Sequence, residues 1–168
     1  MISSRLLVIP FLLQVVCMGV DELYFHHRRK LPRWERIGHP LDTLTVVLCL
    51  GLVLVVPPSP ASLSVYLILC VFSCLFVTKD EWVHHKFCSA GEQWMHALQF
   101  ILHSLVLLCA GLLWPTLHEQ TLNFIYYEGF ERTFFKVNLG LTFLFGFYQL
   151  IYWNFLWRPA PAGISANK

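Results

Sequence analysis

Acidic and histidine side chains occur in the same order at two places in this chain. The stretch DELYFHH begins at Asp21, and the stretch DEWVHH begins at Asp80. Each stretch ends an apolar segment, and each is followed by a Glu-x-x-x-His pattern, which begins at Glu35 in the first case and at Glu92 in the second. Carboxylate oxygens and imidazole nitrogens are common ligands of iron, zinc and manganese. The repeated order therefore indicates a metal site that is built from two parts of the chain.

Helical spacing would bring the acid and the histidine of each stretch together. Residues four apart lie on one face of a helix, as Glu22 and His26 do. Glu81 shares a face with His85 at four residues and with His84 at three. If four helix ends converge, the predicted ligands are Glu22, His26, His27, Glu35, His39, Glu81, His84, His85, Glu92 and His96. So many ionisable groups would repel one another without a cation. Two divalent metal ions match the ligand count, with iron preferred and zinc or manganese as alternatives.

Three other polar residues are predicted to support the site. Asp21 and Asp80 each precede the Glu of their stretch and lie about 100° away from it on a helix, where either can hold a histidine ring by its second nitrogen. His103 lies inside an apolar segment, two turns after His96 and one turn after Gln99. An ionisable residue in such a segment is a candidate functional residue. Its role stays open between a deeper ligand, a proton relay and a satisfied core residue.

The pattern resembles two classes of metalloprotein over residues 21–39 and 80–103. Carboxylates and histidines on four helices are similar to the ferritin-like di-iron bundles, although the pairs here are mostly four residues apart rather than three. The set also resembles the membrane desaturases and hydroxylases, without their HxxxH and HxxHH boxes. The resemblance implies an oxygen-activating oxidoreductase that acts on a lipid or another hydrophobic small molecule dissolved in the membrane, with an electron-donor protein as partner.

Several other functions fit the same residues. A metal-dependent lipid hydrolase would use zinc to activate water and a Glu as base. A metal-binding or transport accessory protein, or a structural subunit whose charged loops dock a partner, would need no catalysis. His96 and His103 share a helix face and suit haem ligation, although the many acids count against it. A simple belt of interfacial charge is the remaining alternative. Nucleic acid is not an expected partner, because the chain has no basic patch interleaved with aromatics.

The composition predicts the elements that position these residues. The chain is 57% hydrophobic and 13% charged, which is typical of an integral membrane protein. Apolar segments lie at about 5–20, 41–56, 61–78, 95–114 and 135–157. We therefore expect an all-α integral membrane protein. A duplicated helical hairpin (about 5–56 and 61–114) forms a four-helix core, a fifth transmembrane helix completes one domain at 1–157, and residues 158–168 form a flexible tail.

Two local signals predict where helices begin. Ser89 stands three residues before Glu92, which is the spacing of a capping box. In the first half, Pro32 and Pro40 interrupt the corresponding region. Because proline suits the first turn of a helix, we expect the second long helix to restart at Pro40.

The six cysteines offer no recognisable metal-binding pattern. Five of them lie in apolar runs, and their spacing matches neither a zinc ribbon nor a CxxC motif. We therefore expect inert thiols that pack as small hydrophobic side chains.

The distribution of lysine and arginine predicts an orientation in the membrane. Basic residues are concentrated in the two connections that carry the acids and histidines: Arg28, Arg29, Lys30, Arg33 and Arg36 in the first, and Lys79 and Lys86 in the second. Basic connections face the cytoplasm. Both His/acid connections and the C-terminus are thus expected on the cytoplasmic side, with the N-terminus outside.

Overall fold

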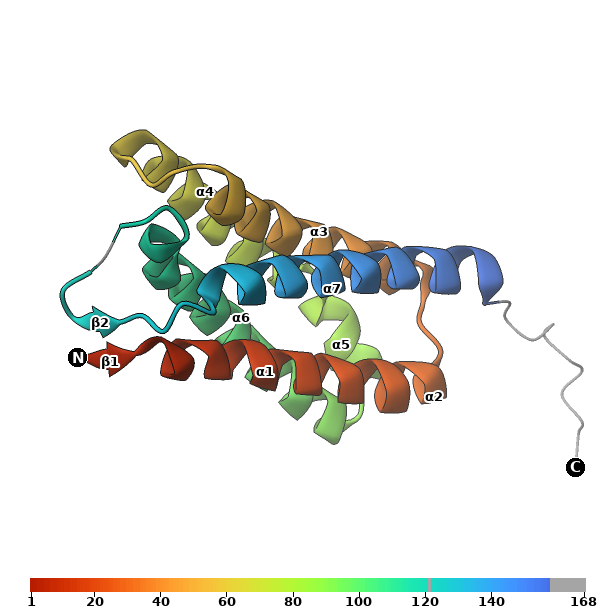
Figure 1. The fold of residues 1–168 in the computed structure, drawn as a ribbon. Coiled ribbons are helices and arrows are strands. Elements are labelled where there is room, and N and C mark those ends of the chain that lie inside the picture. Colours follow the sequence, from red (N-terminus) through yellow and green to blue (C-terminus); the bar gives the residue numbers. More distant parts are fainter. Residues whose placement is uncertain (121, 158–168) are drawn as a thin grey trace, which may run out of the picture.

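Five long helices form within residues 1–120 and 122–157, which the computed structural model describes apart from the side chains of Asp80, Val83 and Phe87. They are α1 (Ser4–Val20), α3 (Arg33–Val55), α4 (Pro60–Phe76), α6 (Ala90–Leu117) and α7 (Glu131–Ile151) (Figure 1). With the short segments that extend some of them, all five are long and apolar enough to cross a membrane. The prediction of an all-helical chain with five apolar helices is confirmed. The predicted tail at 158–168 and the predicted role of the Asp80 side chain lie outside the described residues.

Short helical segments at one end of the molecule carry the acidic and histidine residues. The π-helix η1 (Asp21–His26) continues α1 and leads into α2 (His27–Arg29). The 3₁₀ segment η2 (Val77–Asp80) and helix α5 (Glu81–Phe87) follow α4, and a second π-helix, η3 (Tyr152–Leu156), ends α7. π-Helical turns are rare and are frequent at functional sites. Their occurrence here agrees with a site at this end.

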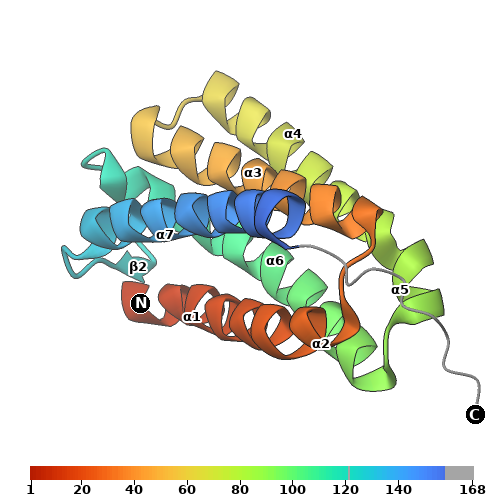
Figure 2. The ribbon, with the colours of Figure 1, turned by 90° about the vertical axis from the view of Figure 1, so that its right-hand side faces the viewer.

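The long helices pack pairwise around an apolar core. α1 packs along α6, α7 packs along α3, and α4 lies against both α3 and α6 (Figures 1 and 2). Cys49 and Leu50 of α3 and Ala110 and Leu113 of α6 are completely buried in this core. Outward side chains are also large and apolar along much of the bundle, as Ile68 is on α4. The bundle is therefore apolar both inside and outside.

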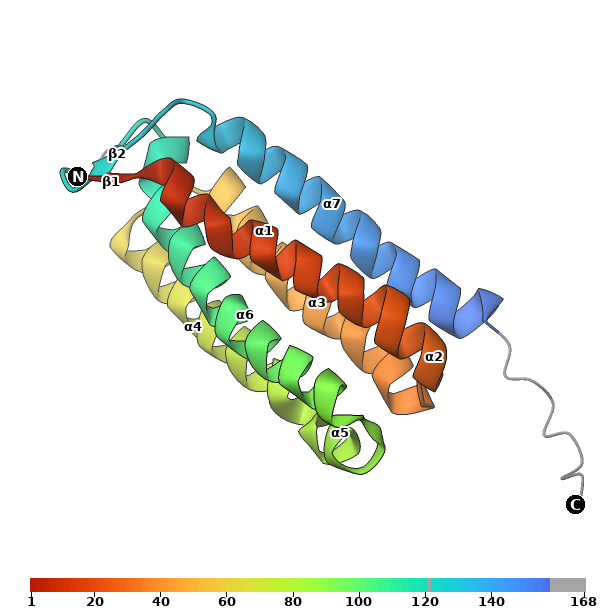
Figure 3. The same ribbon diagram turned by 90° about the horizontal axis from the view of Figure 1, so that it is seen from below.

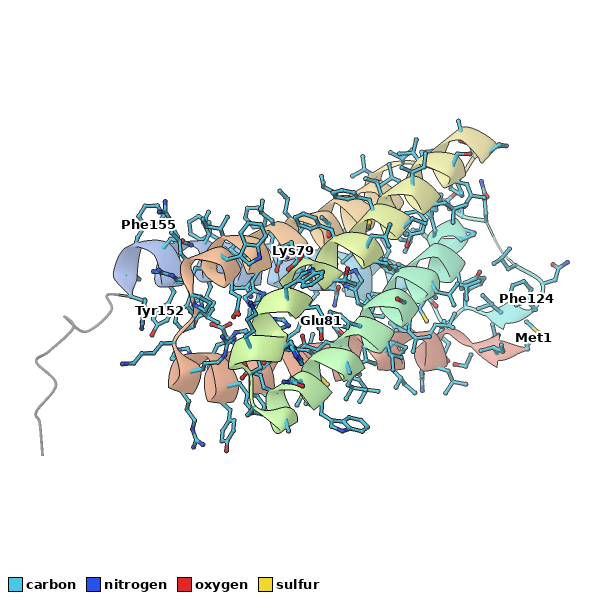
Figure 4. All side chains as sticks on the ribbon, turned by 180° about the vertical axis from the view of Figure 1, so that it is seen from behind. Met1, Lys79, Glu81, Phe124, Tyr152 and Phe155 are labelled. Atoms are coloured by element: carbon cyan, nitrogen blue, oxygen red, sulfur yellow. The ribbon has the colours of Figure 1, made fainter. Side chains whose placement is uncertain are left out.

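The N-terminus lies at the end of the bundle opposite the acidic and histidine segments. Strand β1 (Ile2–Ser3) pairs in parallel with strand β2 (Ile125–Tyr126), which ties the N-terminus to the connection between α6 and α7. Met1 and Phe124 lie at this end, whereas Tyr152 lies at the other (Figure 4). Helices α2 and α5 share the end that carries Tyr152 (Figures 1 and 3). The two basic connections therefore lie together at one end of the bundle.

The two halves of the chain share an order of elements but differ at their polar ends. In each half a long helix is followed by short helical segments, a brief break and another long helix. In the first half the polar segment is π-helical and continues α1 directly, whereas in the second half a 3₁₀ turn separates α4 from α5. Helix α7 packs along α3 and is an integral part of the bundle. The internal duplication stays a prediction, because a shared order of elements does not establish it.

Helix α3 does not restart at Pro40 but runs unbroken from Arg33 to Val55, so that expectation is wrong. Pro40 has no N–H to donate to the carbonyl of Arg36, four residues earlier. Asn154 of η3 supplies the missing donor, because its Nδ2 lies 2.9 Å from the Arg36 carbonyl oxygen. A neighbouring helix thus satisfies the carbonyl group that the proline leaves without an intrahelical partner.

Replacing Asn154 tests this compensation. We expect Asn154→Leu to lower the free energy of unfolding by about 1–3 kcal/mol, because the Arg36 carbonyl loses its donor. Pro40→Ala restores an N–H within α3, so the same Asn154→Leu change should cost much less in that background. Thermal unfolding of the four proteins in detergent measures the difference, and an equal loss in both backgrounds would contradict the explanation.

Candidate metal centre

Seven acidic and histidine residues are buried together where η1, α5 and the first turns of α3 and α6 meet. Each is at most 5% exposed: Asp21, Glu22, His26, Glu35, His84, Glu92 and His96. Acidic side chains are almost never fully buried unless they are paired or bind a metal. We refer to these seven residues as the polar cluster. All of them except Asp21 were predicted as metal ligands, and Asp21 was predicted as their supporting partner.

Asp21 joins the two halves of the polar cluster. Both of its carboxylate oxygens lie 3.2 Å from Nε2 of His96 on α6. One of them, Oδ2, also lies 3.3 Å from Nε2 of His26 and accepts a 3.2 Å hydrogen bond from the amide of Gln99. Asp21 therefore lies between two predicted ligand rings and contacts a nitrogen of each, where it can hold the rings, as predicted, or bind an ion itself.

Glu22 faces the opposite side of η1 and is fixed by two partners. Its Oε2 lies 3.1 Å from Nδ1 of His26, which is the four-residue pairing that the sequence predicted. Its Oε1 accepts a 2.6 Å hydrogen bond from the indole Nε1 of Trp153 on η3. A tryptophan at the end of an apolar segment resembles any residue of an interfacial aromatic belt. Only the packing of η3 over η1 shows that Trp153 holds a predicted ligand.

Three imidazoles in the polar cluster have ring nitrogens that lack hydrogen-bond partners among the described residues, and one of these nitrogens is Nε2 of His26, which lies 3.3 Å from Asp21 without a hydrogen bond. Neither nitrogen of His84 has a partner among the described residues, and neither does Nδ1 of His96. Both rings are 4% exposed, and their centroids lie 4.0 Å apart. Oε1 of Glu35 lies 4.0 Å from Nε2 of His84. Buried polar atoms are normally satisfied, and an ion is one of the usual reasons for an exception.

Potential ligand atoms converge in two overlapping sets. Asp21, His26, Glu92 and His96 each offer an atom such that all four lie within 4.8 Å of one another. His84, Cys88 and His96 form a second set with the same property. Because His96 belongs to both sets and an imidazole has two nitrogens, the two sets adjoin at this ring. The arrangement suits one or two metal ions.

Cys88 was not among the predicted ligands. It lies one turn after His84 and is half-buried. Burial raises the pKa of its thiol to about 12, so the free thiol stays protonated at neutral pH. A bound metal ionises a coordinating thiol. The spacing His84-x-x-x-Cys88 was the available signal, since residues four apart share a helix face.

Arg29 is another residue of the centre that the sequence did not single out. Its Nη1 and Nη2 donate to the two carboxylate oxygens of Glu35 at 3.1 and 2.5 Å, and its Nε donates to Glu92 at 2.8 Å. One guanidinium thus joins the first turns of α3 and α6. Ser89 caps α6 as predicted, with Oγ accepting the Glu92 N–H, but the Glu92 carboxylate bonds Arg29. In the sequence Arg29 is one of several consecutive basic residues, which conceals this role.

Four predicted ligands lie at the edge of the polar cluster or outside it. The ring of His39 stacks on that of His26 at a centroid distance of 4.9 Å and is partly buried. His27, Glu81 and His85 are exposed. Helix α5 is short, and the side that faces the cluster carries His84, so Glu81 and His85 point elsewhere. The structure therefore brings together fewer ligands than the repeated order suggested.

His103 lies deeper in the bundle and belongs to a separate hydrogen-bond chain. Its Nε2 lies 2.9 Å from Oγ of Ser73, which is in turn 2.6 Å from Oγ1 of Thr45. His103 is in neither ligand set. These hydrogen bonds fit a satisfied core residue and a proton relay equally, and the role of His103 stays a prediction.

A cavity of about 380 Å³ extends from the polar cluster into the bundle. Asp21, His26, His84 and His96 line its polar end. Side chains from α1, α3, α6 and α7 line the remainder, which is mostly apolar and includes Phe11, Val46, Phe100, Val106, Leu141 and Phe145. The volume falls in the range of small-molecule sites. The candidate metal centre therefore has room for an apolar molecule beside it.

Removal of Arg29 tests its structural role. Arg29→Met leaves Glu35 and Glu92 buried without their cation, and breaking such a pairing costs about 3–5 kcal/mol. Arg28→Met is the matched control, because the exposed Arg28 guanidinium lies over the Tyr24 ring, where loss of the contact costs about 0.5–1 kcal/mol. Thermal unfolding in detergent should separate the two variants clearly. Equal destabilisation would show that Arg29 is an ordinary surface residue.

The arrangement is thus a buried set of carboxylates, imidazoles and one thiol at the polar end of an apolar cavity. No protein-family model, curated protein or solved structure matches this chain. The chemistry of the site is accordingly what points to a function.

Proposed function

We propose that this chain is an integral membrane enzyme that binds two divalent metal ions, iron in the first place, and oxidises an apolar substrate dissolved in the membrane. One observation carries the proposal. The buried, unpartnered nitrogens of His84 and His96 lie in two adjoining ligand sets at the end of a largely apolar cavity. Buried ring nitrogens without hydrogen-bond partners favour a bound cation, and an apolar cavity beside them favours an apolar substrate.

The membrane location is supported by the surface of the bundle and by its charge distribution. Five helices are long and apolar enough to cross a bilayer, and their outward faces expose large apolar side chains. The basic connections lie at the end that carries the polar cluster (Figure 1). By the positive-inside rule, this end and the C-terminus face the cytoplasm and the N-terminus faces outside.

The charges of the site favour two ions. Asp21, Glu22, Glu35 and Glu92 are all buried, and Arg29 neutralises one of their four charges. Two divalent cations would balance the other three charges together with an ionised Cys88 thiol, and only the charge of a His96 imidazolate that bridges both ions would remain. A buried site that comes this close to neutrality avoids most of the cost of uncompensated charge in an apolar environment.

We assign the residues of the site to the two ions and to the substrate as follows. Asp21, His26, Glu92 and His96 would hold one ion, and His84 and Cys88 would hold the other with the shared ring of His96, which would lose its N–H proton to bind both ions. Bound iron would supply the activation of dioxygen. In a hydroxylation, one oxygen atom enters a C–H bond and the other leaves as water, with two protons and with two electrons from a reduced electron-donor protein. The cavity would hold the hydrocarbon against the centre and exclude bulk water from it.

A metal-dependent lipid hydrolase is the second candidate, and Cys88 is the observation that favours it. His84, Cys88 and His96 are three ligands of the kind that leave an open fourth position on a catalytic zinc ion. Zinc would lower the pKa of a bound water, and a carboxylate would act as base on an ester bond. The metal that the protein carries when purified decides between the two candidates. Zinc together with ester hydrolysis would favour the hydrolase, and iron together with oxygen consumption would favour the oxidoreductase.

Metal content of matched histidine variants tests the centre. We expect about two ions per chain in the native protein, one in His84→Ala, and none in His96→Ala, because His96 belongs to both sets. His85→Ala is the control, since this neighbouring ring is exposed. Elemental analysis of protein purified in detergent gives the stoichiometry. Metal-free native protein, or equal content in the His84 and His85 variants, would overturn the proposed centre.

Cobalt substitution tests the role of Cys88 separately. A thiolate bound to cobalt(II) gives a sulfur-to-metal charge-transfer absorption in the near ultraviolet. We expect this band in the native protein and in Cys74→Ser, whose thiol lies on α4 away from the polar cluster. We expect its loss in Cys88→Ser, together with a weaker hold on one of the two ions. A band that survives in Cys88→Ser would remove this residue from the ligand set.

A further inference from the structure

We infer that the cavity opens sideways between α1 and α7, and that a single hydrocarbon chain enters it from the bilayer through this opening. The inference rests on the membrane location in the proposed function. It does not depend on which metal binds or on whether metal binds at all. It identifies the substrate class from the position of the opening, because a molecule that enters between α1 and α7 comes from the lipid bilayer.

Two residues mark the opening. Val15 of α1 and Leu141 of α7 both line the cavity, yet their side chains are 53% and 57% exposed. A side chain that contacts both the cavity and the outside forms a wall only one residue thick. At this place Val15 and Leu141 therefore form part of the wall between the cavity and the outer surface.

The line along which α1 and α7 lie side by side, which we call the seam, has strong contacts at both ends and weak packing between them. At the end near the N-terminus, the ring of Phe11 contacts the rings of Phe134 and Phe135 at centroid distances of 5.2 and 5.9 Å. At the other end, Trp153 donates its 2.6 Å hydrogen bond to Glu22. Between these points α1 packs mainly on α6 and α7 mainly on α3, although the two helices run side by side (Figures 1 and 3). The opening has fixed ends and a weakly packed middle.

The surroundings of the opening are apolar. On the same two helices, Val16 and Leu144 are each 61% exposed. In a membrane these faces touch lipid tails, so whatever reaches the opening between Val15 and Leu141 is dissolved among those tails. Water-soluble substrates would have to cross this layer first.

The walls inside the opening suit a methylene chain. Two threonines along the cavity have hydrogen-bond acceptors: Thr43 donates to the side-chain Oε1 of Gln149 at 2.9 Å, and Thr142 donates to the backbone carbonyl of Asn138 at 2.8 Å. Oε1 of Gln14 is buried without a partner among the residues that the structure describes. This oxygen favours a chain that carries a hydroxyl group as donor. The occupant that fits is therefore a long-chain alcohol or a lipid with a free hydroxyl.

A chain that enters here reaches the polar cluster within a short distance. Val15 and Asp21 both line the cavity and are six residues apart on one continuous helical segment. At 1.5 Å per residue this is about 9 Å along the axis. Part of a long chain would then lie beside the proposed ligands while the remainder stays in the opening or the bilayer.

Photolabelling in lipid vesicles tests the opening. A long-chain alcohol that carries a diazirine is activated by light in vesicles that contain the native protein, and the labelled residues are mapped by mass spectrometry. We expect adducts on cavity residues such as Met18 and Phe145, and their loss when hexadecanol competes. In Val15→Trp/Leu141→Trp, which blocks the opening, cavity adducts should fall about tenfold. In the control Val16→Trp/Leu144→Trp, which lies on the same helices away from the cavity, they should persist.

The outcomes separate this inference from the proposed enzyme. Equal cavity labelling in the blocked and control proteins, or labelling of outer faces only, would overturn the opening. Metal content is measured on the same samples, and metal-free protein with labelled cavity residues would overturn the proposed centre while the opening stands. Gel filtration reports folding, and Leu141→Trp alone replaces the double variant if that protein aggregates.

Discussion

The structure depends on the burial of four carboxylates at one end of an otherwise apolar bundle. Asp21, Glu22, Glu35 and Glu92 are each at most 5% exposed, and charges of one sign repel strongly where water is excluded. Arg29 relieves part of this repulsion by bridging α3 and α6 through Glu35 and Glu92. The same requirement explains why histidines surround the remaining acids and why a cation is the natural completion of the site.

The polar end and the apolar cavity are coupled by shared residues. Glu22 binds His26 in the polar cluster and also Trp153, which fastens the seam between the first and last helices. A change of charge at Glu22 would therefore affect its hydrogen bond with Trp153, at the edge of the proposed opening. Rigid fixation of the ligands by neighbours that are themselves packed is what a metal site needs to hold its geometry.

Much of the fold could be predicted because apolar periodicity and length report directly on helices. The five apolar segments, the Ser89 cap and the helical pairing of Glu22 with His26 follow from local rules. The start of α3 could not be predicted in the same way. Pro40 is tolerated inside the helix because Asn154, far away in the sequence, donates to the Arg36 carbonyl, and no local rule contains that contact.

The sequence by itself determined the kinds of polar side chain and the end of the bundle at which they gather, since residue type and helical spacing are local properties. Only the tertiary structure decided which residues face inward. It placed His84 inside and His85 outside, because one face of the short helix α5 meets the cluster. It also brought Arg29, Cys88 and Trp153 to the site. Burial and neighbourhood arise from the packing of several helices, which spacing along one helix does not specify.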